Sequence, residues 1–278
     1  MNIKIVSDSS SNLLDFEGVP YATVPLKIIT ADAEYVDDKS LDVAGMVADL
    51  RTVKGRTRTS CPNVYEWQSA MGDAEQVVAV TITGNLSGSY STAMQARNDL
   101  LAEHPDRKIA VIDSLSTGPE MQLLIERLRD EILAGKSFEE VERAVRQYQK
   151  HTHLLFSLKS MLNLARNGRV NAVVAKLAGV LGIRVVGVAS EQGTLELLHK
   201  PRGQEKMLLS LLEEMEGRGY AGGKVRIAHC GDVAVATLLA ERIHAAFPDA
   251  DVQTIAATAL CSYYAEEGGL LVGFEDGL

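Results

Sequence analysis

Strand-like and helix-like segments alternate along almost the whole chain, and this alternation limits the possible folds more than any other feature. Short runs rich in β-branched residues are followed by amphipathic stretches that begin with capping residues. Two capping boxes, Asn63 with Glu66 and Ser137 with Glu140, mark the starts of helices. The alternation favours a doubly wound parallel α/β sheet in the first half of the chain. We predict strands over 3–7, 21–29, 76–82, 108–112, 152–158, 183–190, 194–200, 224–230, 251–257 and 268–275, with a break in the second strand at Pro25. We predict helices over 41–53, 63–72, 89–103, 119–134, 137–150, 204–217 and 233–246, with Ser40 as the cap of the first helix.

The pattern changes after about residue 150. A helix-like apolar run follows at 172–182, and a β-hairpin is predicted with its turn at 191–193, where a glycine supplies the positive φ. The length of 278 residues is enough for two modest domains, each with its own core. We therefore expect an N-terminal α/β domain over 1–150 and a smaller C-terminal α/β domain over 151–278.

Composition argues against several classes of function. A net charge of −9 at pH 7 argues against nucleic acid or an anionic membrane surface as the main partner. Apolar runs stay shorter than the ~20 residues of a membrane-spanning helix, and MNIKIVSDSS indicates a strand rather than a signal peptide. Cys61, Cys230 and Cys261 lack CxxC spacing, which predicts three reduced thiols. We expect a cytoplasmic, soluble protein with no stable membrane insertion.

Four polar segments follow predicted strands: SDSSS (7–11), RTSCPN (58–63), TGNLSGS (83–89) and DSLSTG (113–118). Ligands bind parallel sheets outside the carboxyl ends of the strands, so we expect these segments to lie close together. They share hydroxyl and backbone N–H groups and contain few cationic or titrating side chains. Such groups suit the binding of an anion or a carboxyl group, although each segment could also serve only to cap a helix.

The segment 83–89 does not match a known catalytic turn. A nucleophile elbow requires GxSxG, but Gly84 stands one position too early relative to Ser87. His229 is the best placed histidine for a triad, and the His-Thr-His at 151–153 lacks a third metal ligand. Neither GxxxxGK[ST] nor GxGxxG occurs. The segment is therefore interpreted as a binding turn, with a serine hydrolase that uses Ser87 on a small ester as the alternative.

Taken in order, these and other segments resemble the DegV family of bacterial lipid-binding proteins. The matching segments are IKIVSDSSSNL, VPLKI with YVDD, RTSCPN, GNLSGSY and VIDSLSTG in the first half, and LARNGRV, LGIRVVGV and HKPRGQEKML in the second. Each motif is short, but the ordered set covers essentially the whole chain and is specific.

The resemblance implies a two-domain α/β protein that holds one long-chain fatty acid between its domains. Family members serve as the acyl-carrying subunit of a bacterial fatty acid kinase in phospholipid metabolism. A separate kinase subunit, related to dihydroxyacetone kinases, phosphorylates the bound carboxylate. The resemblance therefore implies a lipid-binding protein with the fatty acid as its ligand and with no catalytic residue, cofactor or metal of its own.

By position, the resemblance assigns the fatty acid carboxylate to Thr59 and Ser87. Ser60 and the N–H groups of Gly88 and Ser89 are the supporting donors that it implies. The basic positions that would face the kinase are Arg169 and Arg202, and the expected tunnel walls are Ile28, Leu162, Leu164, Val174 and Leu177.

The C-terminal segment departs from the family pattern. A His-Thr-Gly-Pro-Gly segment usually precedes the last strand, and alignment on that strand places Tyr264 where the histidine would be. A phenol can donate a hydrogen bond but does not become a cation near neutral pH. The acidic pair at 266–267, which like the pair at 37–38 indicates a solvated loop, would repel the phosphate end of a kinase. We therefore expect these changes to affect kinase coupling more than lipid binding, and a lipid-binding protein without a kinase is a further alternative.

Overall fold

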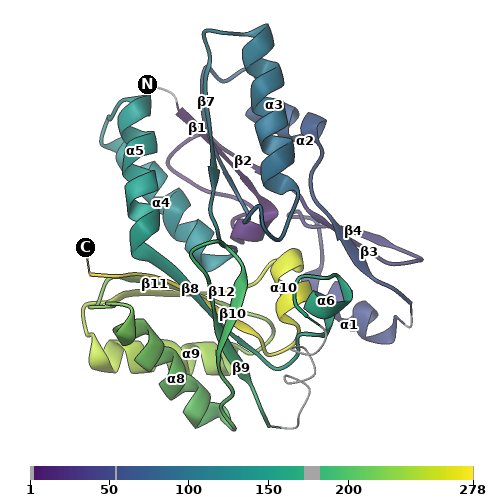
Figure 1. The fold of residues 1–278 in the computed structure, drawn as a ribbon, viewed down its shortest axis with the longest axis vertical. Coiled ribbons are helices and arrows are strands. Elements are labelled where there is room, and N and C mark those ends of the chain that lie inside the picture. Colours follow the sequence, from purple (N-terminus) through teal and green to yellow (C-terminus); the bar gives the residue numbers. More distant parts are fainter. Residues whose placement is uncertain (1–2, 54, 172–181, 278) are drawn as a thin grey trace.

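A four-stranded parallel sheet organises the first half of the chain. The computed structural model describes residues 3–53, 55–171 and 182–277. The strands of this sheet are β1 (Ile3–Asp8), β2 (Tyr21–Val24), β6 (Gln76–Thr81) and β7 (Lys108–Asp113). They lie in the order β2-β1-β6-β7, so the winding of the chain reverses between β1 and β6 (Figure 1). In open α/β sheets, ligands bind at such a reversal, outside the carboxyl ends of the strands.

Helices cover both faces of this sheet. They are α2 (Val64–Met71), α3 (Ser89–Glu103), α4 (Pro119–Leu133) and α5 (Phe138–Tyr148). Val77 and Ala79 of β6 pack with Trp67 in the layer of α2 and α3, whereas Val78 and Val80 pack in the layer of α4 and α5. Because both faces are buried, β6 is a continuous apolar run in the sequence.

A small antiparallel sheet adjoins the first one. Its elements and the two helices packed on it are β3 (Lys27–Ile29), β4 (Glu34–Val36), β5 (Arg58–Ser60), α1 (Val43–Thr52) and α10 (Ala259–Ala265). The strand order is β4-β3-β5, and Ile28 of β3 packs with Met46 of α1 and Tyr263 of α10. The predicted break at Pro25 is confirmed, because it separates β2 and β3, which belong to different sheets.

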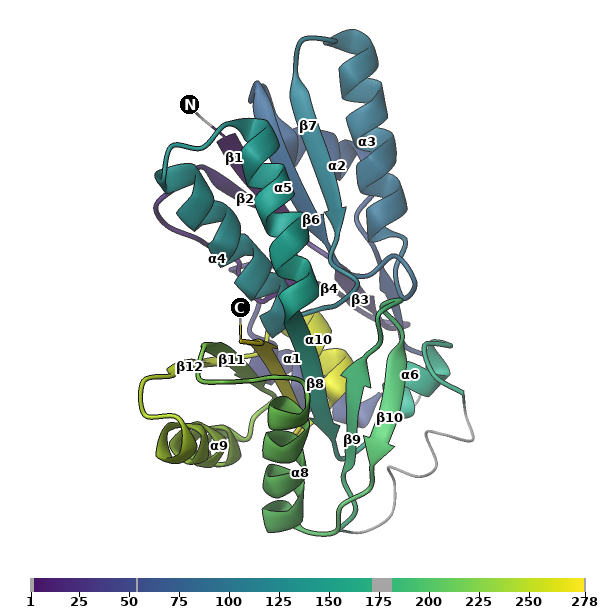
Figure 2. The same cartoon turned by 60° about the vertical axis from the view of Figure 1, so that its left-hand side comes forward.

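The second half of the chain forms a six-stranded mixed sheet. Its elements are β8 (Thr152–Leu158), β9 (Val185–Ala189), β10 (Leu195–His199), β11 (Lys224–His229), β12 (Asp251–Ala256) and β13 (Leu270–Glu275), with helices α6 (Leu162–Arg166), α8 (Gln204–Gly217) and α9 (Val233–Ala246). The order is β10-β9-β8-β13-β11-β12, and only β11 and β12 are parallel neighbours. Helices α8 and α9 lie on the side away from the parallel sheet (Figures 1 and 2). Leu155 faces these helices, while Leu154 and Phe156 belong to a separate cluster on the opposite face.

Most predicted elements are confirmed, and α3, α8 and α9 have the predicted bounds. The cap of α1 is a correction, because Asp42 accepts the backbone N–H of Gly45 at 3.0 Å, while Ser40 donates its hydroxyl to Asp38 at 2.6 Å. Helix α10 was not predicted, and the helix-like run 172–182 lies outside the described residues except for its last position. Across the described ranges, we find no helix that combines the length and apolar character needed to span a bilayer.

The change from the parallel to the mixed sheet falls between α5 and β8. This change supports a domain boundary near residue 150, which stays a prediction. Helix α4 contacts β8, β11 and β13 as well as its own sheet, so it joins the two halves.

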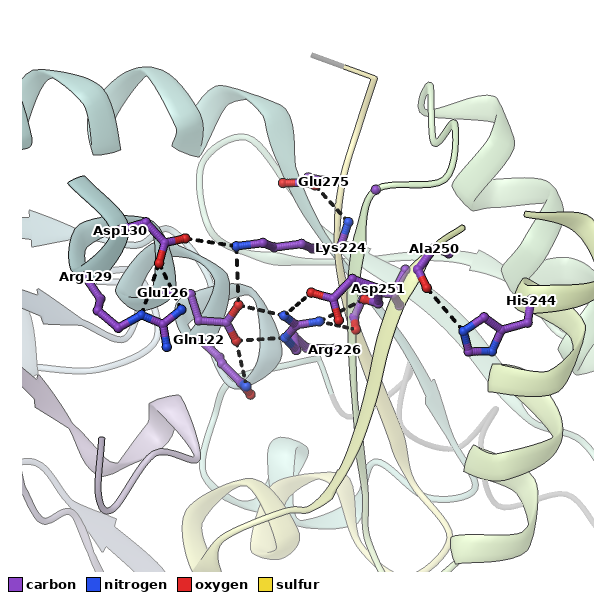
Figure 3. A network of polar contacts seen from close by, with 12 residues as sticks. Gln122, Glu126, Arg129, Asp130, Lys224, Arg226, His244, Ala250, Asp251 and Glu275 are labelled. Atoms are coloured by element: carbon purple, nitrogen blue, oxygen red, sulfur yellow. Dashed lines mark hydrogen bonds and ion pairs between the residues drawn. The ribbon is translucent and has the colours of Figure 1, made fainter. Parts of the chain in front are cut away.

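A buried ion network links α4 to the second sheet (Figure 3). The Arg226 side chain on β11 is 2% exposed and donates from Nε and Nη2 to the two carboxylate oxygens of Glu126, each at 2.7 Å. Nη2 also donates to Asp251 at 2.8 Å, and Lys224 pairs with Asp130 at 3.2 Å. The two-oxygen contact between Arg226 and Glu126 fixes orientation as well as distance across the junction.

Glu120, in the first turn of α4, is a second buried ionisable side chain at this junction. It is 5% exposed and accepts a hydrogen bond from the Thr152 hydroxyl of β8 at 2.9 Å. Burial raises the pKa of Glu120 from 4.5 to about 7, and its hydrogen bonds oppose that rise. The protonated form is therefore favoured by folding.

We expect Glu120→Gln to stabilise the protein above pH 7. A carboxyl group whose pKa is raised in the folded state contributes stability that is complete below pH 4.5 and is lost as pH rises through about 7. The neutral amide avoids this loss, which is on the order of 3 kcal/mol. Urea unfolding at pH 5 and pH 8 measures the effect. A variant whose stability falls between pH 5 and 8 as steeply as that of the wild type would contradict the assignment.

Candidate functional site

Asp8 ends β1 at the point where the strand order reverses. It is fully buried, and its Oδ2 accepts hydrogen bonds from the backbone N–H of Ile82 at 2.9 Å and the Ser89 hydroxyl at 2.6 Å. Burial raises the pKa of Asp8, while hydrogen bonds from Ser10 and Ser89 oppose that rise. These contacts fix the start of α3 relative to β1, so the turn before α3 has a defined place at the carboxyl end of the sheet.

The turn places Ser87 and Gly88 directly before α3, with Gly88 as the N-cap residue. Ser87 Oγ accepts the backbone N–H of Ser89 at 3.3 Å. A Cβ added to Gly88 would lie 3.1 Å from Cys61 Sγ, so glycine allows the segment 58–63 to approach closely. Two of the four predicted hydroxyl segments therefore meet here.

A cavity of about 350 Å³ opens between this end of the parallel sheet, α10 and the inward face of the second sheet. Its volume lies in the range of small-molecule sites, which is roughly 300–1,000 Å³. The apolar lining consists of Leu26, Cys61, Ile82, Leu86, Leu154, Phe156, Leu158, Leu164, Leu195, Leu260, Cys261, Ala265 and Leu271. The remaining lining residues are Thr59, Ser60, Ser87, Gly88, Thr117, Arg169 and Tyr264.

Several of these remaining residues are joined by direct contacts. The hydroxyls of Thr59 and Tyr264 are 2.7 Å apart, and the Arg169 guanidinium carbon lies 5.9 Å from the centre of the Tyr264 ring. Arg169 donates to the carbonyl of Leu86 at 3.1 Å and to that of Asn167 at 2.6 Å. Burial raises the pKa of the Tyr264 phenol, so the phenol remains a hydrogen-bond donor at neutral pH.

This part of the cavity suits an anion. Hydroxyl groups and one guanidinium can donate to an oxygen anion, and the described lining holds no Asp, Glu or His side chain that would repel it or act as a base. The rest of the wall is apolar, so an elongated amphiphile with an anionic head fits the lining chemistry better than a compact polar molecule.

The structure brings most of the predicted site residues to this cavity. Thr59, Ser60, Ser87, Gly88 and Tyr264 all line it. The remaining three are Ser89, Arg169 and Arg202.

Ser89 is fully buried and is not among the lining residues. Its backbone N–H, the predicted donor, bonds to Ser87 Oγ at 3.3 Å, and its hydroxyl donates to Asp8. Arg169, expected to face a partner, lines the cavity itself. Arg202 is exposed and forms an isolated bridge with Ile183, away from the lining residues. Contact of Arg169 and Arg202 with a kinase partner stays a prediction.

The walls were predicted less well than the polar groups. Leu164 lines the cavity, but Ile28 belongs to the core beneath α1 and α10, and Leu162 is 46% exposed. Val174 and Leu177 lie outside the described residues. The missed walls come mainly from β8 and α10, namely Leu154, Phe156, Leu158, Leu260, Cys261 and Ala265. Alternation along β8 could have identified the first three, because residues two apart in a strand share a face.

The acidic pairs need correction. Asp37 is fully buried rather than solvated, and it accepts hydrogen bonds from the start of α10. Glu266 accepts the backbone N–H of Asn163 at 3.0 Å, and only Glu267 is exposed, where it pairs with Arg51.

All six histidines lie in the described part of the chain, and none of them lines the cavity. Within the same residues, no group of three or more His, Cys, Asp or Glu side chains could hold a metal ion. The three cysteines are free thiols, as predicted, and Cys61 and Cys261 contribute apolar surface to the cavity.

Known proteins with this sequence pattern and fold share one family. The sequence model of the DegV family matches residues 2–275. A DegV domain-containing protein of Streptococcus pneumoniae is 43% identical over an alignment of 282 positions, which covers 99% of this chain and 99% of that protein.

Two solved structures match over the full length. A DegV family protein from Eubacterium eligens, loaded with heptadecanoic acid, is 44% identical with a TM-score of 0.97, covering 99% of this chain and 100% of that one. The Fatty Acid Kinase (Fak) B3 protein of Streptococcus pneumoniae, loaded with linoleic acid, is 43% identical with a TM-score of 0.98, covering 100% of both chains. The sequence and the fold thus agree: this chain belongs to the DegV family.

Proposed function

We propose that this protein binds one long-chain fatty acid in the cavity, with the carboxylate held by Thr59 and Ser87. The observation that carries the proposal is a largely apolar cavity whose hydroxyl and guanidinium groups come together at Thr59, Tyr264 and Arg169. The two relatives loaded with heptadecanoic and linoleic acid support it. The protein is then a lipid-binding protein, and neither a cofactor nor a metal takes part.

The tail and the head of the ligand have separate roles. A C16 tail buries about 14 methylenes at ~0.8 kcal/mol each, a gross gain of roughly 11 kcal/mol before the costs of association. Each hydrogen bond to a charged carboxylate contributes about 1.5–3 kcal/mol. The tail therefore sets most of the affinity, and the hydroxyl groups set the orientation of the carboxylate.

We expect Ser87→Ala to weaken fatty acid binding by about 1–3 kcal/mol, up to the full value of one hydrogen bond to a charged group. Titration with a fluorescent fatty acid measures the change. Ser91→Ala is the matched control, because Ser91 is a nearby exposed residue of α3 that does not line the cavity. If Ser87→Ala binds as tightly as Ser91→Ala, Ser87 does not hold the carboxylate.

Presentation to a separate kinase is the second part of the proposal. The similarity to the Fatty Acid Kinase (Fak) B3 protein supports a carrier whose bound carboxylate is phosphorylated by a separate kinase subunit. In this proposal the carrier is cytoplasmic, and exposed Arg202 lies on the face that meets the kinase. The test is transfer of labelled phosphate from ATP to bound hexadecanoic acid by the kinase subunit of the same host. If no acyl phosphate forms although the fatty acid stays bound, the protein carries lipid without a kinase.

A serine hydrolase remains the contrasting function. Stoichiometric labelling of Ser87 by a fluorophosphonate probe would establish it and refute the binding role. We expect no labelling, because a hydrolytic serine needs a general base and the described lining contains no histidine.

A further inference from the structure

Helix α10 carries a large share of the cavity wall, yet its own first turn has no local cap. Leu260, Cys261, Tyr264 and Ala265 line the cavity. The N-cap residue Thr258 makes no side-chain bond to the first turn of α10. The position of α10 must therefore be set by contacts from elsewhere in the chain.

Asp37 supplies those contacts from the end of β4. Its Oδ1 accepts the backbone N–H of Ala259 at 2.8 Å, and its Oδ2 accepts the backbone N–H of Leu260 at 3.1 Å and the Thr258 hydroxyl at 3.3 Å. The side chain is 0% exposed, so these bonds are shielded from water. A carboxylate at a helix start also interacts favourably with the helix dipole.

The same small sheet holds the other end of α10. Thr59 of β5 contacts the Tyr264 hydroxyl at 2.7 Å, and Thr57, just before β5, contacts the Tyr263 hydroxyl at 2.6 Å. Strands β4 and β5 both pair with β3, so Asp37 and Thr59 belong to one rigid frame. Two points of attachment on one sheet fix both where α10 begins and where Tyr264 lies.

We infer that Asp37 is a positioning residue for fatty acid binding, which acts by holding Tyr264 of α10 against Thr59. The inference rests on the proposed function, because it concerns the same cavity. Asp37 itself does not line the cavity. Asp37 acts through α10. Loss of its charge therefore lowers fatty acid affinity only because it displaces Tyr264.

The test is a double-mutant cycle with hexadecanoic acid. Asp37→Asn keeps the size of the side chain but sets an NH2 group against one of the backbone N–H donors of α10. We expect binding to weaken about tenfold, the value of one hydrogen bond to a charged group. Tyr264→Phe also weakens binding, and in that background Asp37→Asn is expected to cost less than about threefold, because interacting residues are not additive.

Asp38→Asn is the matched control. Asp38 is the next residue, and its carboxylate accepts from the backbone N–H of Ser40 at 2.8 Å and from the Ser40 hydroxyl at 2.6 Å, without touching α10. We expect wild-type affinity for this variant. Wild-type affinity of a folded Asp37→Asn variant, or losses that add fully with Tyr264→Phe, would overturn the inference.

A measurement on the wild-type protein keeps the inference testable if Asp37→Asn does not fold. Hexadecanoic acid is expected to slow hydrogen exchange at the Ala259 and Leu260 amides, because a ligand that needs Tyr264 in place also stabilises the start of α10. Unchanged exchange at both amides in the loaded protein would refute the coupling. If the wild type and Asp38→Asn both fail to bind hexadecanoic acid, the proposed function fails instead.

Discussion

Replacing Arg226 by leucine is expected to lower the free energy of unfolding by about 3–5 kcal/mol, because the buried Glu126 carboxylate keeps only Gln122 at 3.0 Å and the more distant Lys224 at 3.8 Å. The Glu126 side chain is 6% exposed, and both of its oxygens bond to Arg226 at 2.7 Å. Asp251 is 48% exposed and can be hydrated instead, so the cost arises mainly at Glu126. Denaturation by urea, followed by circular dichroism, measures the loss.

Two variants make this result interpretable. Arg242→Leu removes a partly exposed arginine that pairs with Glu205, a carboxylate with 71% exposure, and should change stability by about 0–1 kcal/mol. Adding Glu126→Leu to Arg226→Leu should restore most of the loss, because the double variant no longer buries a charge. If Arg226→Leu is as stable as Arg242→Leu, the network does not stabilise the junction of α4 and β11.

Shortening the ligand is expected to have a comparable effect on binding. Decanoic acid has six fewer methylenes than hexadecanoic acid, and at ~0.8 kcal/mol each the difference is roughly 5 kcal/mol, or more than a thousandfold in affinity. We expect the longer tail to cover the apolar cavity walls that β8 and α10 supply. Displacement of a fluorescent fatty acid, with both acids below their micelle concentrations, measures the ratio.

Hexadecanol separates the contribution of the tail from that of the head. It keeps the full tail but lacks the carboxylate. Compared with hexadecanoic acid, its binding free energy should weaken only by the contribution of the hydrogen bonds to the charged head, about 1.5–3 kcal/mol each. Similar affinities for decanoic and hexadecanoic acid would contradict a buried tail and would place the chain outside the cavity.

Local sequence signals predicted most of the fold. The capping boxes at Asn63 and Ser137 are both formed, because the capping bonds involve residues only three positions apart. The alternation of strands and helices likewise reports the local period of apolar residues, which the sequence contains in full.

The missed features depend on contacts between residues far apart in the chain. Helix α10 spans seven residues, and six of them are buried, so the segment shows no amphipathic period that would mark a helix. Asp37 was interpreted as solvated because its partners, Ala259 and Leu260, lie more than 200 positions later. The pairing of Arg226 with Glu126 could not be predicted for the same reason, because the two residues are 100 positions apart.

The candidate site divides in the same way. Thr59 and Ser87 were named from the sequence by their match to the family's short motifs. Ser87 lies beyond the end of β6, near the reversal of strand order, whereas Thr59 lies within β5 of the small antiparallel sheet. The role of Ser89 could not be predicted, because its hydroxyl is used by Asp8 across the sheet. The apolar walls also escaped prediction, since any buried leucine resembles ordinary core until the packing of the two sheets is known.

Native mass spectrometry of the purified protein, with lipid extraction under denaturing conditions, is the most direct test of fatty acid binding. We expect one adduct per chain that extracts as a C14–C18 fatty acid and is displaced by added hexadecanoic acid. A protein that keeps its apo mass after incubation with hexadecanoic acid would show that the cavity does not bind fatty acids.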